Sequence, residues 1–169
     1  EELAGELARI SFSTVYSSDL LRTFRTTDIV KGKRNLSITP SVFLREQERG
    51  RFEGRPSKEF NEATKKLREA TKDRTEQEQW FSRIESCKES EGEVLARFSK
   101  ELRRIASENL GKTVLVCTHG GPLRFFLQQE GLVPFGSLPP GSFKNAGYLI
   151  VKCDGSDFIF EKADGFEKK

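Results

Sequence analysis

The only histidine of this chain, His119, lies in the stretch VLVCTHGGPLRFF. Residues 114–117 are apolar or small and predict a short buried strand, and Pro122 opens an apolar segment typical of a helix. Between them, Gly120 and Gly121 would let backbone N–H groups approach an anion closely at a helix N-terminus. The stretch therefore indicates a phosphate or carboxylate site. For the histidine taken alone, a loop residue bonded to a neighbouring carbonyl is the alternative.

Three more charged residues could contribute to such a site. Arg22 falls one turn into a predicted helix, from where its side chain can swing back toward the loop beyond the preceding strand. Glu46 and Glu53 lie in the loop LREQERGRFEG. Each of these residues alone is typical of a solvated surface charge. Only the combination of Arg22, Glu46 and His119 indicates a functional site.

A cysteine thiolate would be a different nucleophile for the same kind of chemistry. In cysteine-dependent phosphatases a loop of five residues separates the thiolate from an arginine, whereas six residues separate Cys117 from Arg124. Cys117 also falls within the predicted strand, where a thiol is more often an inert small apolar group. The sequence therefore disfavours a cysteine mechanism.

The composition is that of a globular protein, and 169 residues suit one domain. Lys and Arg (29) barely exceed Asp and Glu (26) and the two signs are interspersed, so nucleic-acid binding gains no support. No apolar run approaches the roughly 18 to 20 residues of a membrane span, so no membrane association is predicted. Cys87, Cys117 and Cys153 show no CxxC spacing. We therefore expect no disulfide framework, no metal or other cofactor, and a reducing, cytoplasmic compartment.

Alternating helices and strands must position the charged residues. Helical spacing predicts that residues 1–10 finish a helix and that further helices cover 19–31 (with Ser18 as N-cap), 57–85, a stretch around 94–105, and the segment from 122. Strands are predicted at 13–18, 36–39 and 114–117, and a hairpin at 146–152 and 157–163 around Asp154-Gly155. The helices at 57–85 and 94–105 are interpreted as surface helices. We predict a three-layer α/β fold, in which helices flank a largely parallel sheet closed by an antiparallel edge.

Three motifs in this order, SSDLLRTFRT, LREQERGRFEG and VLVCTHGGPLR, closely resemble those of the histidine phosphatase superfamily, which has the phosphoglycerate mutase-like fold. The resemblance spans nearly the whole chain and includes the pair Gly92-Glu93 followed by Arg97. It implies that Arg22 clamps the transferring phosphoryl group and that Glu46 donates a proton to the leaving oxygen. It also implies that His119 stabilises the phosphoryl group in transfer. Physically these roles are charge stabilisation and general acid catalysis.

One part of the family's site is missing from these residues. Its nucleophile is another histidine, in an Arg-His-Gly motif at the end of the first strand, upstream of the helix that EELAGELARI would finish. The chain has no second histidine and no methionine. We therefore expect residues 1–169 to be an N-terminally incomplete domain that lacks its first strand and is inactive alone. A natural form without a nucleophile is the alternative.

The resemblance implies a phosphatase acting on small phosphorylated metabolites. The long polar insertion between the Glu46 loop and the His119 strand is more similar to fructose-2,6-bisphosphatase-type (TIGAR-like) or broad-specificity phosphatases than to a mutase. A phosphoglycerate mutase-type phosphotransferase and a non-catalytic binding protein remain the alternatives. The sequence predicts no oligomeric state.

Overall fold

The parallel sheet consists of three short strands, β1 (Thr14–Ser18), β2 (Ile38–Ser41) and β3 (Val114–Cys117). In the computed structural model, which describes residues 2–166, β1 lies in the middle and pairs in parallel with β2 and β3. Val15 and Tyr16 of β1 are both buried, as expected for a central strand with both faces covered. The carboxyl ends of β1 and β3 therefore lie next to each other.

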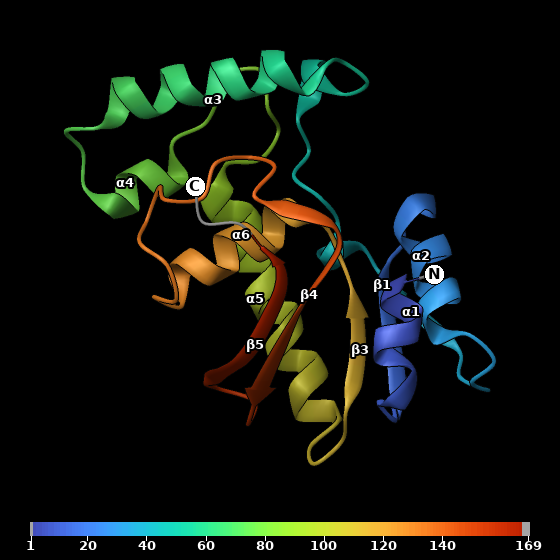
Figure 1. Cartoon of the computed structure of the whole chain (residues 1–169). Coiled ribbons are helices and arrows are strands. Elements are labelled where there is room, and N and C mark those ends of the chain that lie inside the picture. Colours follow the sequence, from blue (N-terminus) through green and yellow to red (C-terminus); the bar gives the residue numbers. More distant parts are fainter. Residues whose placement is uncertain (1, 167–169) are drawn as a thin grey trace.

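Helices cover both faces of this sheet (Figure 1). They are α1 (Glu2–Glu6), α2 (Leu21–Lys31), α5 (Glu91–Glu108) and α6 (Gly120–Gln129). On one face, Val15 packs with Leu7, which follows α1, and with Val30 of α2. On the other face, Tyr16 belongs to the larger core that α5 and α6 supply. The predicted three-layer α/β arrangement is confirmed.

The helix α5 lies deeper than the surface position predicted for it. Its Val94 and Phe98 are fully buried, because α6 packs along its apolar face. The helix begins at a capping box, in which the Ser90 side chain accepts from the Glu93 amide and the Glu93 side chain accepts from the Ser90 amide. Within residues 2–166 no helix, α5 included, is long and apolar enough to cross a membrane.

The predicted helix at 57–85 is two helices, α3 (Ser57–Thr71) and α4 (Glu76–Phe81). A second capping box, between Thr75 and Glu78, starts α4. A continuous helix would leave these side chains without those backbone partners, so the local T-x-x-E pattern ends one helix and begins the next. Figure 1 shows α3 and α4 set apart from the sheet, beyond α5 and α6.

The predicted hairpin is present as the antiparallel strands β4 (Phe143–Cys153) and β5 (Phe158–Phe166). Asp154 closes its turn, because the Asp154 carboxylate accepts from the amides of Ser156 and Asp157. However, the pair forms a separate two-stranded sheet and, in the described residues, does not pair with β3. The prediction that it closes the parallel sheet as an antiparallel edge is therefore wrong. A groove lined by both β3 and β4 separates the two sheets.

The junction between β1 and α2 also differs from the prediction. Ser18 is the last residue of β1, and α2 begins at Leu21 with Leu20 as its N-cap. The Ser18 hydroxyl lies 3.4 Å from the Leu20 amide but only 2.9 Å from a ring nitrogen of His119. A tertiary partner has thus taken the side chain that a local rule assigned to helix capping.

Candidate active site

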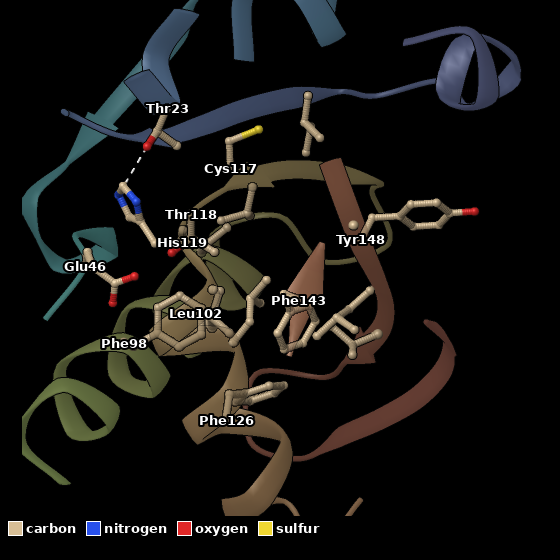
Figure 2. A pocket seen from close by; sticks show the side chains of 18 of the residues that line it. Thr23, Glu46, Phe98, Leu102, Cys117, Thr118, His119, Phe126, Phe143 and Tyr148 are labelled. Atoms are coloured by element: carbon tan, nitrogen blue, oxygen red, sulfur yellow. Dashed lines mark hydrogen bonds between the residues drawn. The ribbon is translucent and has the colours of Figure 1, made fainter. Parts of the chain in front are cut away.

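The candidate site lies where β1 and β3 end (Figure 2). His119 follows β3 by two residues and is the N-cap of α6. Because β1 and β3 are parallel neighbours, Ser18 and His119 reach the same edge of the sheet, where parallel α/β folds bind ligands. His119 is 9% exposed and lines the same groove as Arg22 and Glu46. The structure therefore brings together the residues that the sequence singled out.

Three side chains hold the His119 ring in place. Its Nε2 lies 2.9 Å from Ser18 Oγ and 3.1 Å from Thr23 Oγ1, and its Nδ1 lies 3.3 Å from Arg22 Nη2. A guanidinium nitrogen can only donate, so Nδ1 accepts from Arg22. The ring proton is then on Nε2, which donates to the hydroxyl oxygens. The ring is neutral in this arrangement.

The electrostatic surroundings agree with a neutral ring. Burial, together with the charges of Arg22, Arg97 and Arg49, lowers the pKa of His119 to about 4, against an opposing effect of Asp19. A buried pocket with an excess of positive charge favours an anion. A phosphate bound there would bring negative charge to the ring and raise the pKa of His119, so that filling the pocket favours proton uptake.

Arg22 and Gly120 are the predicted anion-binding groups beside the ring. Arg22 lies in the first turn of α2, and its guanidinium reaches the His119 ring, which follows β3. Gly120 is the exposed first residue of α6 and lines the groove. A helix N-terminus directs unpaired N–H groups and a partial positive charge at such a position. Anion binding by Arg22 and Gly120 stays a prediction.

Glu46 approaches the same helix N-terminus from the other side. Its Oε1 accepts from the Gln47 amide at 2.9 Å, and its Oε2 accepts from the Gly121 amide at 3.3 Å. Arg49 Nη2 lies 3.7 Å from Oε2. Figure 2 shows the Glu46 carboxylate and the His119 ring on the same side of the site. The carboxylate is thus placed next to the groove in which an anion would bind.

Gly121 permits this approach because it has no side chain. A Cβ atom at position 121 would lie 2.1 Å from Glu46 Oε1, closer than any non-bonded contact allows. At Gly120 the same addition would meet only the Cβ of Phe143, at an ordinary 3.7 Å. The second glycine, rather than the first, is therefore the one that the position of Glu46 requires.

Glu53 has a different role. Its Oε1 accepts a hydrogen bond from the Arg49 amide at 2.8 Å. This bond stabilises a turn of the loop, and the carboxylate has no contact with His119 among those that the structure shows. Residues 2–166 contain no group of three or more His, Cys, Asp or Glu side chains placed to hold a metal ion.

The alternative pair of Cys117 and Arg124 does not form a site. Burial raises the pKa of the Cys117 thiol, against a smaller lowering effect of its bond with Thr27, so the thiolate is disfavoured. Arg124 is buried in another contact, donating to Glu91 Oε1 and to the Leu138 carbonyl, both at 2.9 Å. The two side chains serve separate structural contacts.

Sequence reasoning missed the residues that support the site. Ser18 and Thr23 bind the ring. The sequence offered one indication of this role: Ser18 is a polar residue at the end of a buried strand, and Thr23 is a polar residue in the first turn of the following helix. The pair Gly92-Glu93 is not part of the site, because Glu93 caps α5. Arg97, noted only as part of that motif, donates to the backbone carbonyls of the Glu46 loop, which we define as residues 43–49.

The low pKa of His119 predicts a pH response of its ring. The pKa in the folded chain lies below the ordinary 6.5, so the stability that the neutral ring supplies is present above about pH 6.5 and is lost as the pH falls toward 4. The ring is the only imidazole of these residues, and its Cε1–H NMR signal can be followed without assignment. We expect a midpoint near 4, which inorganic phosphate moves upward. A midpoint at or above 6.5 without phosphate would contradict this electrostatic picture.

Comparison with known proteins agrees with this geometry. Residues 1–164 match the family model of the histidine phosphatase superfamily (branch 1). Phosphoglycerate mutase-like protein 4 of Arabidopsis thaliana is 34% identical over 117 residues, which cover 66% of this chain and 47% of that protein. The chain thus spans about half the length of the curated relative that it matches.

Solved structures show the same fold. YhfR of Bacillus stearothermophilus has a TM-score of 0.77 at 22% identity, covering 98% of this chain and 79% of that one. A mycobacterial glucosyl-3-phosphoglycerate phosphatase has a TM-score of 0.70 at 20% identity, covering 98% of this chain and 82% of that one. With the family match over nearly its whole length, the chain belongs to the histidine phosphatase superfamily (branch 1).

Proposed function

We propose that this chain is part of a phosphatase that hydrolyses a small phosphorylated metabolite, such as a sugar phosphate or bisphosphate, through a phosphohistidine. The observation that carries the proposal is the meeting of Arg22, Glu46 and His119 where β1 and β3 end. Membership of the superfamily supports phosphoryl chemistry, and a phosphatase is among the solved proteins that share the fold.

Each residue has a physical task in this reaction. Arg22, the Gly120 amide and a protonated His119 surround the phosphoryl group and stabilise its charge as it transfers. Glu46 donates a proton to the oxygen that leaves, because an alkoxide is a poor leaving group without one. In the next half-reaction the same carboxylate takes a proton from the water that attacks the phosphohistidine, which restores the acid.

The nucleophile is proposed to come from a segment upstream of residue 1, since these residues contain no second histidine. The groove between β3 and β4 supports this proposal. It has a volume of about 1680 Å³ and runs from the site along both strands, with Leu102, Phe126 and Tyr148 among its lining residues. One further strand would fit between two strand edges and be covered by α5 and α6. It would have to run parallel to β3 for its carboxyl end to reach His119.

We propose one histidine phosphatase-like domain that needs this upstream strand, and the polar insertion of α3 and α4 supports the fructose-2,6-bisphosphatase-type branch. The three free cysteines support a cytoplasmic location.

The mutase alternative is favoured by the name of the Arabidopsis relative. It is distinguished by transfer of phosphate between sugar acids from a bisphosphorylated primer, where a phosphatase transfers it to water.

The need for an upstream nucleophile can be tested with two lengths of the protein. We expect residues 1–169 to show no turnover of p-nitrophenyl phosphate and the natural full-length protein to show it, because only the latter would supply the second imidazole. Equal turnover by both lengths would remove the upstream nucleophile from the proposal. Inactivity of the full-length protein toward all phosphomonoesters would favour a non-catalytic binding protein.

The role of Glu46 as proton donor can be tested through the leaving group. In the full-length protein, Glu46→Gln should reduce kcat/KM for a sugar phosphate about a hundredfold or more. The loss should be far smaller for p-nitrophenyl phosphate, because nitrophenolate departs without a proton. Equal losses on both substrates would instead assign Glu46 to binding or folding.

The contact between Gly121 and Glu46 predicts that Gly121→Ala has the same selectivity. The added methyl group would displace the carboxylate, so kcat/KM should fall more for the sugar phosphate than for p-nitrophenyl phosphate. Gly120→Ala is the matched control, since it adds the same group to the same turn without a clash. If the control shows the same selectivity, the effect comes from the helix N-terminus and not from Glu46.

A further inference from the structure

Arg97 makes an unusual set of hydrogen bonds with the backbone of the Glu46 loop. It projects from the middle of α5, and its side chain is 17% exposed. Nη1 donates to the carbonyls of Phe43 and Arg45, both at 2.8 Å, and Nη2 donates to the carbonyl of Glu46 at 3.0 Å. A single guanidinium thus binds three carbonyls of one short loop.

These three carbonyls surround the residue that carries the carboxylate. The Arg45 carbonyl belongs to the peptide that precedes Glu46, and the Glu46 carbonyl belongs to the peptide that follows it. Fixing both peptides fixes the Cα–Cβ direction of Glu46, and the Gly121 amide then holds the far end of its side chain. Arg97 therefore determines the origin of the side chain, and α6 determines its end.

Glu89 orients the guanidinium. Its Oε1 accepts from Arg97 Nε at 2.7 Å, and its Oε2 accepts from Arg97 Nη2 at 3.0 Å. The same carboxylate accepts from the Glu48 amide at 3.0 Å. Burial raises the pKa of Glu89, but the bonds from Arg97 and Glu48 outweigh burial, and the pKa is lowered overall. The bidentate pair stays ionised, and its planar fork leaves the remaining N–H groups aimed at the loop.

A second buried arginine shows that such contacts need not concern the site. Arg124 also bonds a glutamate and a carbonyl, those of Glu91 and Leu138. Its partners lie outside the Glu46 loop. Arg97 and Arg124 therefore form a natural pair for comparison, with similar chemistry and different targets.

We propose that Arg97 is a positioning residue for the proton donor, which holds the backbone of the Glu46 loop so that the carboxyl group meets the leaving oxygen. The inference rests on the proposed function of Glu46. In the step concerned, the imidazole nitrogen of the proposed upstream histidine forms a bond to phosphorus, the P–O bond to the leaving group breaks, and the electron pair of that bond goes to the leaving oxygen. The O–H bond of the Glu46 carboxyl group breaks as the proton passes to the same oxygen. Arg97 itself gives up no proton in this step and acts through the backbone that carries Glu46.

The charge of the Arg97 guanidinium and its geometry can be separated by Arg97→Lys. Lysine keeps a positive charge near the phosphoryl pocket, but one ammonium group lacks the planar fork that reaches three carbonyls and Glu89 together. If Arg97 acted only by attracting the phosphate, the variant would retain most activity on every substrate. If it acts through Glu46, the loss depends on whether the leaving group needs a proton.

The experiment measures kcat/KM of the full-length protein for a sugar phosphate and for p-nitrophenyl phosphate, and compares the ratio of the two values with that of the parent. We expect the ratio to fall at least about tenfold in Arg97→Lys and further in Glu46→Gln. Arg124→Lys should leave the ratio unchanged, even if the protein becomes less stable. In the double variant Glu46→Gln/Arg97→Lys, the ratio should be no lower than in Glu46→Gln, since the group that Arg97 positions is already gone.

The outcomes separate the inference from the function on which it rests. A ratio that falls in Glu46→Gln but not in Arg97→Lys overturns the positioning role and leaves Glu46 as the donor. A ratio that falls in neither variant removes Glu46 as the donor. An equal fall in Arg124→Lys assigns the effect to general loosening of the core and also overturns the inference.

A second variant covers the case in which Arg97→Lys does not fold. Glu89→Gln keeps the side-chain shape but removes the charge that orients the guanidinium. The ratio is then expected to fall by a smaller factor in the same direction. An unchanged ratio in a folded Glu89→Gln protein overturns the positioning role.

Discussion

The pairing of β1 with β3 is the constraint on which the site depends. Val15 pairs with Leu115 and Tyr16 with Val116, and the two pairs face opposite layers of helices. A shift of one residue would turn apolar side chains to the wrong layer, so burial fixes the register. The same register sets Ser18 beside His119. The packing of the hydrophobic core thus determines the distance between Ser18 Oγ and His119 Nε2, which lie far apart in the sequence.

The hydrogen bonds of His119 couple its protonation to the occupancy of the pocket. Nδ1 cannot accept from Arg22 and carry a proton at the same time. If Arg22 turns to an incoming anion, as its proposed role requires, Nδ1 would become free to take a proton, and the charge of the anion would favour that proton. Ser18 and Thr23 can continue to accept from Nε2 in both states. The ring can therefore change its charge without changing its place, which is what a preorganised charge stabiliser requires.

Local patterns predicted the parts of the molecule that local forces determine. Alternating strands and helices, the hairpin turn at Asp154, and the place of His119 between a strand and a helix all follow from short-range spacing. The break between α3 and α4 is also local, because Thr75 and Glu78 form a capping box. The prediction missed this break because the helical periodicity continues across it. Ser18 shows the limit of local rules. Its hydroxyl could either cap the following helix or bind His119, and the sequence alone does not decide between the two.

The remaining features depend on contacts between distant segments. The separation of the hairpin from β3 depends on which strand edges pair with each other. Strand propensity predicts where strands occur but not which of them pair. The sequence of the Glu46 loop has neither helical nor strand periodicity, and three of its carbonyls accept hydrogen bonds from Arg97, about 50 residues later in the chain. A charged residue on an amphipathic helix is most simply interpreted as solvated. Its buried partners became visible only with the fold.

The segment that carries α3 and α4 leaves the domain and returns to it at almost the same point. At Gly50, whose φ is +57°, a Cβ atom would lie 1.8 Å from the Ser86 carbonyl oxygen, so the chain before the excursion touches the chain after it. Lengthening a loop whose ends already meet costs little free energy. Evolution could therefore exchange this segment for a longer, shorter or differently charged one without moving the Glu46 loop. On the proposed function, such an architecture would let the same reaction be adapted to different substrates.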